Sequence, residues 1–292
     1  MLQVRAIVHR MALYEILRTP ELRAPVLVAA FEGWVDAAGV GTAAAAHIAG
    51  EGELLARFDA EELLDYRARR PTMDIAAGVM QEMVWPEIVV RHASVGGRDV
   101  LVLTGPEPDM RWRHFASSVL DLGLTLGVVS TISLGAIPAA VPHTRPTPVI
   151  STVSDPELLA PGDQVPEGIL RVPAAAVNLV ERAFGEHGIP SGGFWAQVPH
   201  YVVGAYAPSV IALVERVSRA LKVVISLGSL PEEAQQQRAQ LDAMVADRPE
   251  AASYLERLES LVSEESVPSG EEIAAEIERF LRQGPTAPGE LE

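Results

Sequence analysis

Three short apolar runs, each followed at once by a loop rich in glycine or proline, constrain the fold of this chain more than any other feature. The runs are residues 26–31, 100–104 and 128–134, and each has the length of a buried β-strand. Their loops lead into a helical pattern or back into another strand. Because loops at the carboxyl ends of parallel strands meet at one edge of the sheet, where ligands usually bind, we expect a site there.

Polar side chains concentrate on these loops and on one that follows a later strand. The candidates for lining a ligand pocket are Trp34, Asp36, Glu107, Asp109, Arg111, His143, Arg145 and His200. We expect Trp34, Asp36, Glu107 and Arg145 to converge within one cleft, because their loops follow strands at the same edge. The pattern locates a site without naming a reaction.

The same loops resemble a known family. The matching segments, in chain order, are Phe31-Glu32-Gly33-Trp34-Val35-Asp36-Ala37-Ala38-Gly39, Asp65-Tyr66-Arg67-Ala68-Arg69-Arg70-Pro71, Gly105-Pro106-Glu107-Pro108-Asp109 with Trp112, Leu134-Gly135-Ala136 with Pro142-His143-Thr144-Arg145-Pro146, and Pro199-His200-Tyr201. Over roughly residues 25–261 the chain resembles the proteasome assembly chaperone family, second-subunit type, in its bacterial and mainly actinobacterial branch. The resemblance implies a three-layer α/β/α domain similar to nucleoside phosphorylases, a helical C-terminal part and homo-oligomers. It implies no catalytic residues, because the family has none agreed.

Size and composition predict one large α/β domain with a smaller appendage. The chain has 292 residues, of which 48% are hydrophobic, so it can bury a large core. Its start does not resemble a secretory leader, and no apolar run approaches the ~18 residues of a membrane span, so we expect a cytoplasmic protein without membrane contact. The absence of cysteine excludes disulfides, thiolate metal sites and a cysteine nucleophile.

Lysine is almost absent from the chain, and this excludes several cofactor sites. Lys222 is the single lysine among the 23 basic residues. The loop at residues 39–42 therefore lacks the lysine of a nucleotide-binding P-loop, and an ATP-dependent ligase would also need lysines over its nucleotide. The helical setting of Lys222 favours a surface residue over a Schiff base. With no His-x-x-x-His or Asp-x-Asp pattern either, we expect no metal and no cofactor.

The net charge of −16 is concentrated near the C-terminus. Residues 231–292 carry 15 acidic and 5 arginine side chains, a net charge of −10. A strongly acidic chain repels phosphate backbones, which argues against nucleic acid as a partner. We expect the acidic tail to keep a homo-oligomer soluble.

Strand and helix patterns alternate along the first three quarters of the chain. The expected strands are residues 4–8, 26–31, 54–58, 87–92, 100–104, 128–134, 149–153 and 194–198, and the expected helices are residues 36–49, 109–126, 173–187 and 208–221. This alternation predicts a largely parallel sheet covered on both faces. A glycine turn at residues 96–99 predicts a hairpin.

The pattern changes after residue 228. We expect an α/β domain over residues 1–228, a helical part over 229–283 and a disordered tail over 284–292. Two capping boxes, Ser229 with Glu232 and Ser269 with Glu272, predict helix starts. The two expected helices each carry an apolar stripe, which the α/β domain or another subunit must cover.

Asp36 has two possible roles. It stands where a helix is expected to begin, so it can cap that helix by accepting hydrogen bonds from free backbone N–H groups. Alternatively, Gly33 and Gly39 shape a ligand loop around it, with Trp34 as a stacking surface. The frequency of aspartate at helix starts favours the cap.

The other charged candidates also allow two interpretations. Glu107 and Asp109 can form a catalytic pair, or Asp109 can cap the following helix. Arg145, held between prolines, can bind a carboxylate or phosphate while His143 acts as a general acid or base. Arg145 can equally form an internal ion pair with Glu107 or Asp109.

The family resemblance, the acidic helical part and the lack of a catalytic pattern favour a non-catalytic protein of the assembly-chaperone type. Such a protein binds itself and possibly another protein. The alternative is a small-molecule enzyme of nucleoside phosphorylase or hydrolase type, using a pocket at the strand carboxyl ends. A third reading is a ligand sensor without turnover. The sequence does not decide among them, because it carries no recognisable nucleophile, metal or cofactor pattern.

Overall fold

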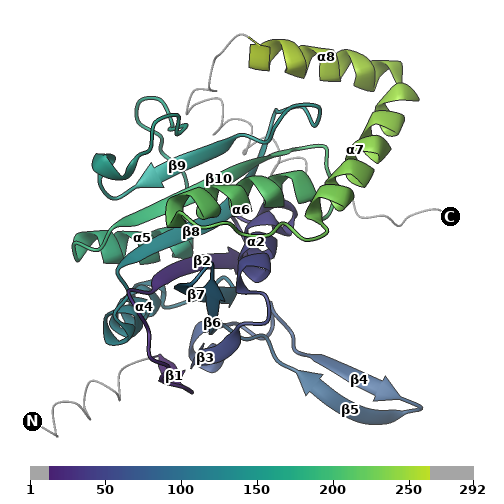
Figure 1. The fold of residues 1–292 in the computed structure, drawn as a ribbon. Coiled ribbons are helices and arrows are strands. Elements are labelled where there is room, and N and C mark those ends of the chain that lie inside the picture. The colour runs from purple at the N-terminus through teal and green to yellow at the C-terminus, as the bar shows by residue number, and fades with distance from the viewer. Residues whose placement is uncertain (1–12, 264–292) are drawn as a thin grey trace, which may run out of the picture.

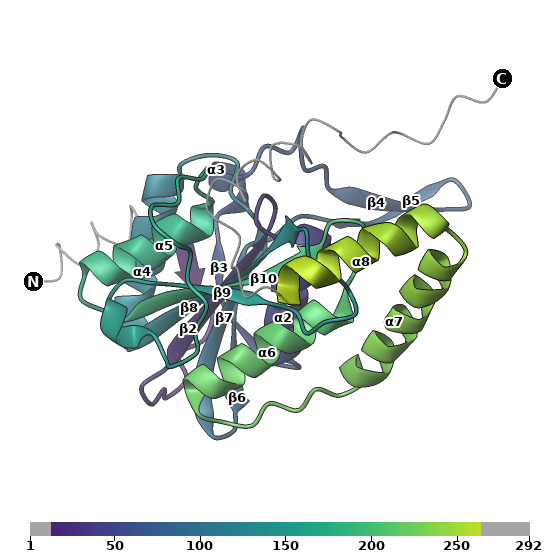
Figure 2. The same cartoon turned by 90° about the horizontal axis from the view of Figure 1, so that it is seen from above.

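The computed structural model describes residues 13–263 and has three layers. An eight-stranded sheet forms the middle layer (Figure 1). Helices α2 (Val40–Ala49) and α6 (Ala207–Leu221) pack on one face, and α4 (Trp112–Leu126) and α5 (Ala176–Glu186) pack on the other (Figure 2). The expected α/β/α architecture is confirmed.

The sheet is parallel in its centre and antiparallel at both sides. In spatial order it contains β1 (Tyr14–Ile16), β3 (Glu53–Phe58), β6 (Val89–Val95), β7 (Arg98–Pro106), β2 (Val26–Glu32), β8 (Ser130–Ala139), β10 (Ser191–Pro199) and β9 (Val149–Val153). Strands β7, β2, β8 and β10 are parallel to one another, so their carboxyl ends share one edge. The outer pairs are antiparallel, so the sheet is mixed rather than largely parallel. The tight turn at Gly96 and Gly97, both with positive φ, reverses the chain between β6 and β7.

Strand β2 explains why the strongest apolar runs are nearly continuous. Its Leu27, Ala29 and Phe31 side chains enter the core beneath α4 and α5, whereas Val26 and Val28, with Ala30, enter the core beneath α2 and α6. A strand covered on both faces needs apolar side chains at every position rather than at alternate ones. Since β2 is a central strand of the sheet, its carboxyl end and the loop that follows it lie in the middle of the edge that the parallel strands share.

Several boundaries differ from the expected ones. A short 3₁₀ turn, η1 (Ala37–Gly39), precedes α2, so the α-helix begins at Val40 rather than at residue 36. Helix α4 begins at Trp112 rather than at residue 109. Two further short elements, α3 (Ala60–Leu63) and η2 (Pro156–Leu158), lie in connections. The strand expected at residues 4–8 lies outside the described residues.

Two helices follow the α/β layers. Helix α7 (Leu230–Ala246) extends away from α6, and α8 (Pro249–Ser263) returns above the sheet (Figure 1). The expected capping box at Ser229 does not form, because its Oγ donates to Oε1 of Glu233 at 2.7 Å and makes no bond to the backbone. The capping box at residues 269–272 and the tail at 284–292 lie outside the described residues. Within residues 13–263, no helix has the length and apolarity needed to span a membrane.

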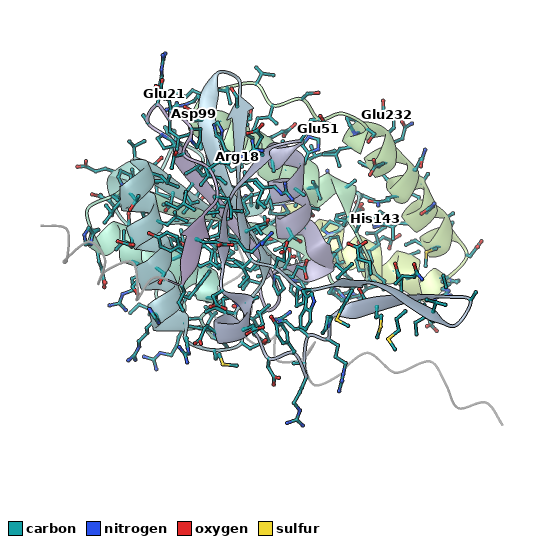
Figure 3. All side chains as sticks on the ribbon, turned by 90° about the horizontal axis from the view of Figure 1, so that it is seen from below. Arg18, Glu21, Glu51, Asp99, His143 and Glu232 are labelled. Atoms are coloured by element: carbon teal, nitrogen blue, oxygen red, sulfur yellow. The ribbon has the colours of Figure 1, made fainter. Side chains whose placement is uncertain are left out.

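A separate hairpin projects from the layers between β3 and β6. Its strands are β4 (Thr72–Ala76) and β5 (Val79–Val84), which pair only with each other. Every residue of both strands is exposed. Figures 1 and 2 show the hairpin extending from the body, and side chains with sulfur atoms stand out from it in Figure 3. The sequence patterns considered above did not predict this element.

Candidate functional site

The eight candidate side chains do not meet in one cleft. Trp34 and His200 line one cavity, whereas His143 and Arg145 line another. The remaining candidates, Asp36, Glu107, Asp109 and Arg111, hold loops in place and line neither cavity. The expectation of a single cleft is therefore wrong, although the loops after β2 and β7 do touch at the shared edge.

The first cavity, which we call the tryptophan cavity, has a volume of about 460 Å³. Trp34 and Trp195 contribute its aromatic surface, and His200 and Asn178 are among its few polar residues. Trp34 is 41% exposed, so part of its ring forms the rim. None of the described residues that line the cavity is a lysine or an arginine. The cavity is suited to an apolar or aromatic group.

The indole ring of Trp195 occupies a space that two glycines of neighbouring strands leave open. A Cβ atom built on Gly135 would lie 2.6 Å from the indole ring, and one built on Gly193 would lie 2.7 Å from it. The two glycines, on β8 and β10, therefore leave the space that the ring occupies. The position of Trp195 in the cavity depends on residues that carry no side chain of their own.

A hydrogen-bond chain connects this cavity to a buried acid. Nε1 of Trp195 donates to Oγ1 of Thr152 at 2.9 Å, and Oγ1 of Thr152 donates to Oε1 of Glu181 at 3.2 Å. Burial raises the pKa of Glu181 from 4.5 to about 7. Sequence reasoning missed Glu181, because its position within an amphipathic helix gave no sign that its carboxyl would face the sheet.

Asp36 caps helix α2 from a position before the 3₁₀ turn. Its Oδ1 accepts from the backbone N–H of Gly41 at 2.6 Å and of Thr42 at 3.2 Å, and its Oδ2 accepts from Oγ1 of Thr42 at 2.5 Å. These N–H groups lie in the first turn of the helix, where they have no helical partner. Burial raises the pKa of Asp36, although the three hydrogen bonds oppose the shift. This carboxylate organises the loop rather than facing a ligand.

The acidic loop after β7 is also occupied by internal contacts. Oε1 of Glu107 accepts from the N–H of Ala176 at 2.7 Å, at the start of α5. Asp109 accepts from the N–H of Asp65 at 2.8 Å and from Nε of Arg69 at 3.3 Å. The two carboxylates thus fasten separate elements through internal hydrogen bonds.

The two arginine candidates behave differently from each other. Arg111 has a left-handed backbone, with φ of 58°, and pairs with Glu62 at 2.5 Å. Arg145 is exposed and forms no ion pair with any described residue, including Glu107 and Asp109. The internal ion pair considered for Arg145 is therefore absent, and its guanidinium is open to a ligand.

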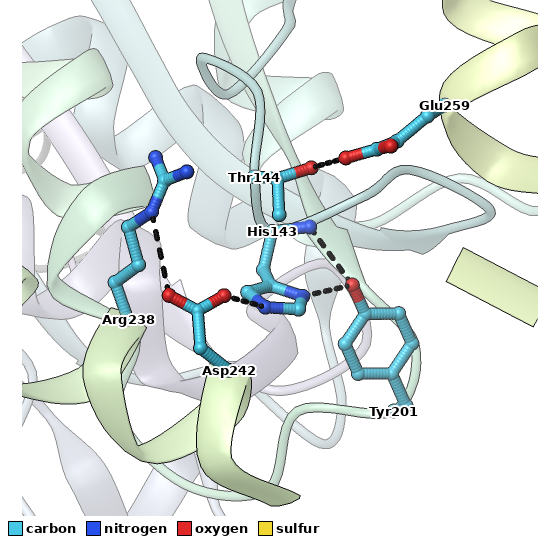
Figure 4. Close-up of polar contacts among 6 residues, drawn as sticks. All are labelled: His143, Thr144, Tyr201, Arg238, Asp242 and Glu259. Atoms are coloured by element: carbon cyan, nitrogen blue, oxygen red, sulfur yellow. Dashed lines mark hydrogen bonds and ion pairs between the residues drawn. The ribbon is translucent and has the colours of Figure 1, made fainter. Parts of the chain in front are cut away.

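His143 joins the α/β layers to helix α7 (Figure 4). Its side chain is fully buried, with Nδ1 2.8 Å from the hydroxyl of Tyr201 and Nε2 3.1 Å from Oδ1 of Asp242. The Tyr201 hydroxyl also accepts a hydrogen bond from the backbone N–H of His143 at 2.8 Å. Burial raises the pKa of Tyr201 to about 12. A neutral imidazole that donates from Nε2 and accepts at Nδ1 satisfies all three contacts. With both nitrogens engaged, His143 acts as a structural link.

Three solved relatives with the same fold come from actinobacteria. A PAC2 family protein from Streptomyces avermitilis is 38% identical, with 79% of this chain and 99% of that chain covered and a TM-score of 0.71. A Mycobacterium tuberculosis protein of unknown function is 36% identical, with coverage of 92% and 96% and a TM-score of 0.82. A proteasome-assembly chaperone homologue from Mycobacterium tuberculosis is 35% identical, with coverage of 79% and 99% and a TM-score of 0.73.

The family model agrees with these structures. A search of curated proteins found no match. The model of the PAC2 family matches residues 30–245, a range that begins within β2 and ends in α7 and so includes the loops described above. On this match and on the identity to three solved relatives, the chain belongs to the PAC2 family.

Proposed function

We propose that this protein is a non-catalytic, cytoplasmic binding protein of the assembly-chaperone type, which associates with itself through the β4–β5 hairpin. Membership of the PAC2 family and the likeness to a proteasome-assembly chaperone homologue support a protein-binding role. The observation that carries the proposal is the hairpin itself. Its strands expose large apolar side chains, and proteins usually cover such a surface by packing it against another one.

The exposed side chains of the hairpin are large and apolar. Met80 is 72% exposed, Ile75 64% and Val79 60%. Only Asp74 and Glu82 carry charge within the two strands. A two-stranded hairpin is marginally stable alone, and packing against another surface supplies what it lacks. These features are typical of an arm that docks on a second chain.

A second copy of the chain offers a fitting surface for this arm. The rim of the tryptophan cavity exposes Trp34 at 41% and Val172 at 44%, and Ile169 nearby is 94% exposed. An apolar arm and an apolar hollow on the same chain can pair between two copies, with each contact burying both surfaces. This complementarity supports self-association as the first use of the hairpin.

Light scattering coupled to size-exclusion chromatography tests the proposal. We expect the parent protein to elute with a mass above its 31.3 kDa monomer, and an Ile75→Ser, Met80→Ser double variant to elute as the monomer. Met244→Ser is the matched control, because Met244 is also exposed, at 58%, but lies on α7. A monomeric parent, or a double variant that assembles like the control, would show that the hairpin does not mediate association.

The tryptophan cavity supports a second candidate function, the binding of a small molecule. Its volume of about 460 Å³ and its two indole rings suit an aromatic ligand. A nucleoside panel with and without phosphate, assayed for release of the base, tests the enzyme alternative. Phosphate-dependent cleavage that is lost in Trp34→Ala, a change within the tryptophan cavity, while the variant melts normally, would overturn the non-catalytic proposal. Quenching of tryptophan fluorescence without turnover would instead indicate a sensor.

A further inference from the structure

A cavity of about 1120 Å³ forms a groove beside helix α6, and we propose that this α6 groove binds an extended acidic segment of a partner polypeptide. One wall is a stripe of α6 that runs from Pro208 through Ile211 to Arg219. Residues of β9 and of the stretch from Leu158 to Gln164 also line the groove, and β8 and β10 contribute Thr131 and Phe194. Helix α6 and strand β9, which both line the groove, lie away from the projecting hairpin (Figures 1 and 2), so the proposal goes beyond the function proposed above.

The charge of the groove is opposite to that of the chain. The charged side chains that line it are Arg98, Arg145, Arg216, Arg219, Lys222 and Arg238 against Asp163 and Glu215. Six cations and two carboxylates give a lining charge of +4, in a chain whose net charge is −16. The single lysine of the chain, Lys222, is among them. Such a local reversal of charge attracts anionic groups from solution and orients them toward the groove.

Part of this charge is committed and part is free. Arg216 pairs with Asp163 and stacks over the ring of Phe194, 4.2 Å from its centroid, so it forms a fixed part of the lining. Arg145, Arg219 and Lys222 are exposed and make no side-chain hydrogen bond or ion pair with any other described residue. These three are the groups that an anionic ligand would meet.

The free cations stand at the two ends of the groove. Arg145 lies at the end formed by residues 143–148, whereas Arg219 and Lys222 lie at the end of α6. Arg219 follows Pro208 by eleven positions in α6, which corresponds to about 17 Å along the helix axis. Roughly five residues of extended polypeptide span that length. A phosphate ion or another small anion would reach one end only.

A buried hydroxyl group in the groove favours a polypeptide over other polyanions. Thr131 is 4% exposed, lines the groove, and has a hydroxyl without a hydrogen-bond partner in the described residues. An extended backbone carries regularly spaced donors and acceptors, one of which can meet this hydroxyl. A nucleic acid would bring its charged backbone against a protein of net charge −16, and this repulsion opposes its approach.

Fluorescence anisotropy on the full-length chain tests this inference. The probe is a labelled alternating Glu-Ala peptide of about ten residues, with Gln-Ala and Lys-Ala peptides of equal length as charge controls. We expect the acidic probe alone to bind, and its affinity to fall by about fivefold or more in Arg145→Gln and in an Arg219→Gln, Lys222→Gln double variant. Added salt should weaken the complex, because the contacts are exposed.

Arg18→Gln provides a matched control for the loss of an exposed arginine. Arg18 has a side chain that is 61% exposed, and it pairs with Glu53 on β3, whereas β9 lies at the opposite side of the sheet. Figure 3 shows Arg18 well apart from His143, which marks one end of the groove. We expect this variant to bind the probe like the parent. Equal thermal melting of all variants establishes that the groove changes leave the fold intact.

Three results would overturn the inference. The first is an acidic probe that does not bind, or that binds equally to the parent and to both groove variants. The second is full competition by inorganic phosphate, which would indicate a small-anion site. The third is tighter binding of a single-stranded oligonucleotide of the same charge and length, which would assign the groove to nucleic acid.

Discussion

Nε2 of His143 and Oδ1 of Asp242 lie 3.1 Å apart, and this contact links the loop after β8 to helix α7 across 99 positions of sequence. The imidazole is fully buried, whereas Asp242 is half exposed and also approaches Nε of Arg238 at 3.8 Å. Helix α7 has no buried residue of its own. Polar links of this kind therefore add to the apolar contacts that Leu230 and Leu241 of α7 make with the core beneath α2 and α6.

Removing this link should loosen helices α7 and α8. In Asp242→Ala the buried Nε2–H of His143 loses its acceptor, which costs roughly 1 kcal/mol of local stability. Hydrogen exchange in α7 should speed up about fivefold while the sheet stays protected. Asp247→Ala, at the end of the same helix, is the control and should exchange like the parent. Unchanged exchange in both variants would mean that the contact does not hold α7.

Glu181 should make stability depend on pH. Its pKa in the folded state, about 7, lies above its ordinary value of 4.5. The stability that this raised pKa contributes is therefore fully present below about pH 4.5 and is lost as the pH rises through 7. Glu181→Gln should therefore raise the stability at pH 8 by about 3 kcal/mol and leave it nearly unchanged at pH 4.5. Thermal melts across this range measure the difference. Glu186→Gln, an exposed position on the same helix, should keep the pH dependence of the parent.

The space around the Trp195 ring should not accommodate an added methyl group at position 135. In Gly135→Ala the new Cβ would lie 2.6 Å from the indole and 2.7 Å from the carbonyl oxygen of Val35, so we expect a loss of about 2 kcal/mol. The tryptophan emission should shift as the ring moves. Gly192→Ala, whose nearest contact would be 3.3 Å, serves as the control and should lose much less. Equal melting temperatures of the two variants would contradict the close packing of Gly135 against the Trp195 ring.

The cap at Asp36 should be measurable by chemical denaturation. Asp36→Ala removes three accepted hydrogen bonds and should cost about 1–2 kcal/mol. Asp36→Asn keeps an acceptor for the N–H groups of Gly41 and Thr42, so it should recover most of that loss. If the alanine and asparagine variants unfold at the same denaturant concentration, the carboxylate is not acting as a cap.

Burial patterns explain what the sequence could predict. Strands β2 and β8 are covered on both faces, so their apolar runs were visible, and α6 showed the stripe of a helix with one covered face. The hairpin β4–β5 escaped notice because neither of its faces is buried, and the polar and apolar alternation of residues 72–75 does not continue into β5. Its turn, at Ala77 and Gly78 with positive φ, is the one local signal that could have found it.

The candidate site was only partly predictable for a different reason. Topology does bring the loops after β2 and β7 together, since a Cβ on Gly33 would lie 2.9 Å from Oε2 of Glu107. The partners of each side chain, however, come from distant elements: Glu107 bonds to α5 and His143 to α7. Residue type and local spacing could not distinguish these structural bonds from chemical roles, because both use the same polar groups.

The hairpin between β3 and β6 gives this fold a replaceable part. It enters and leaves the sheet between two neighbouring antiparallel strands, and its own strands pair with no strand of the eight. Lengthening such an insertion costs only about 0.6 kcal/mol of closure entropy for each doubling of its length. Divergence can therefore rewrite the hairpin while the sheet keeps its register, and an engineer can graft a foreign hairpin there without redesigning the core.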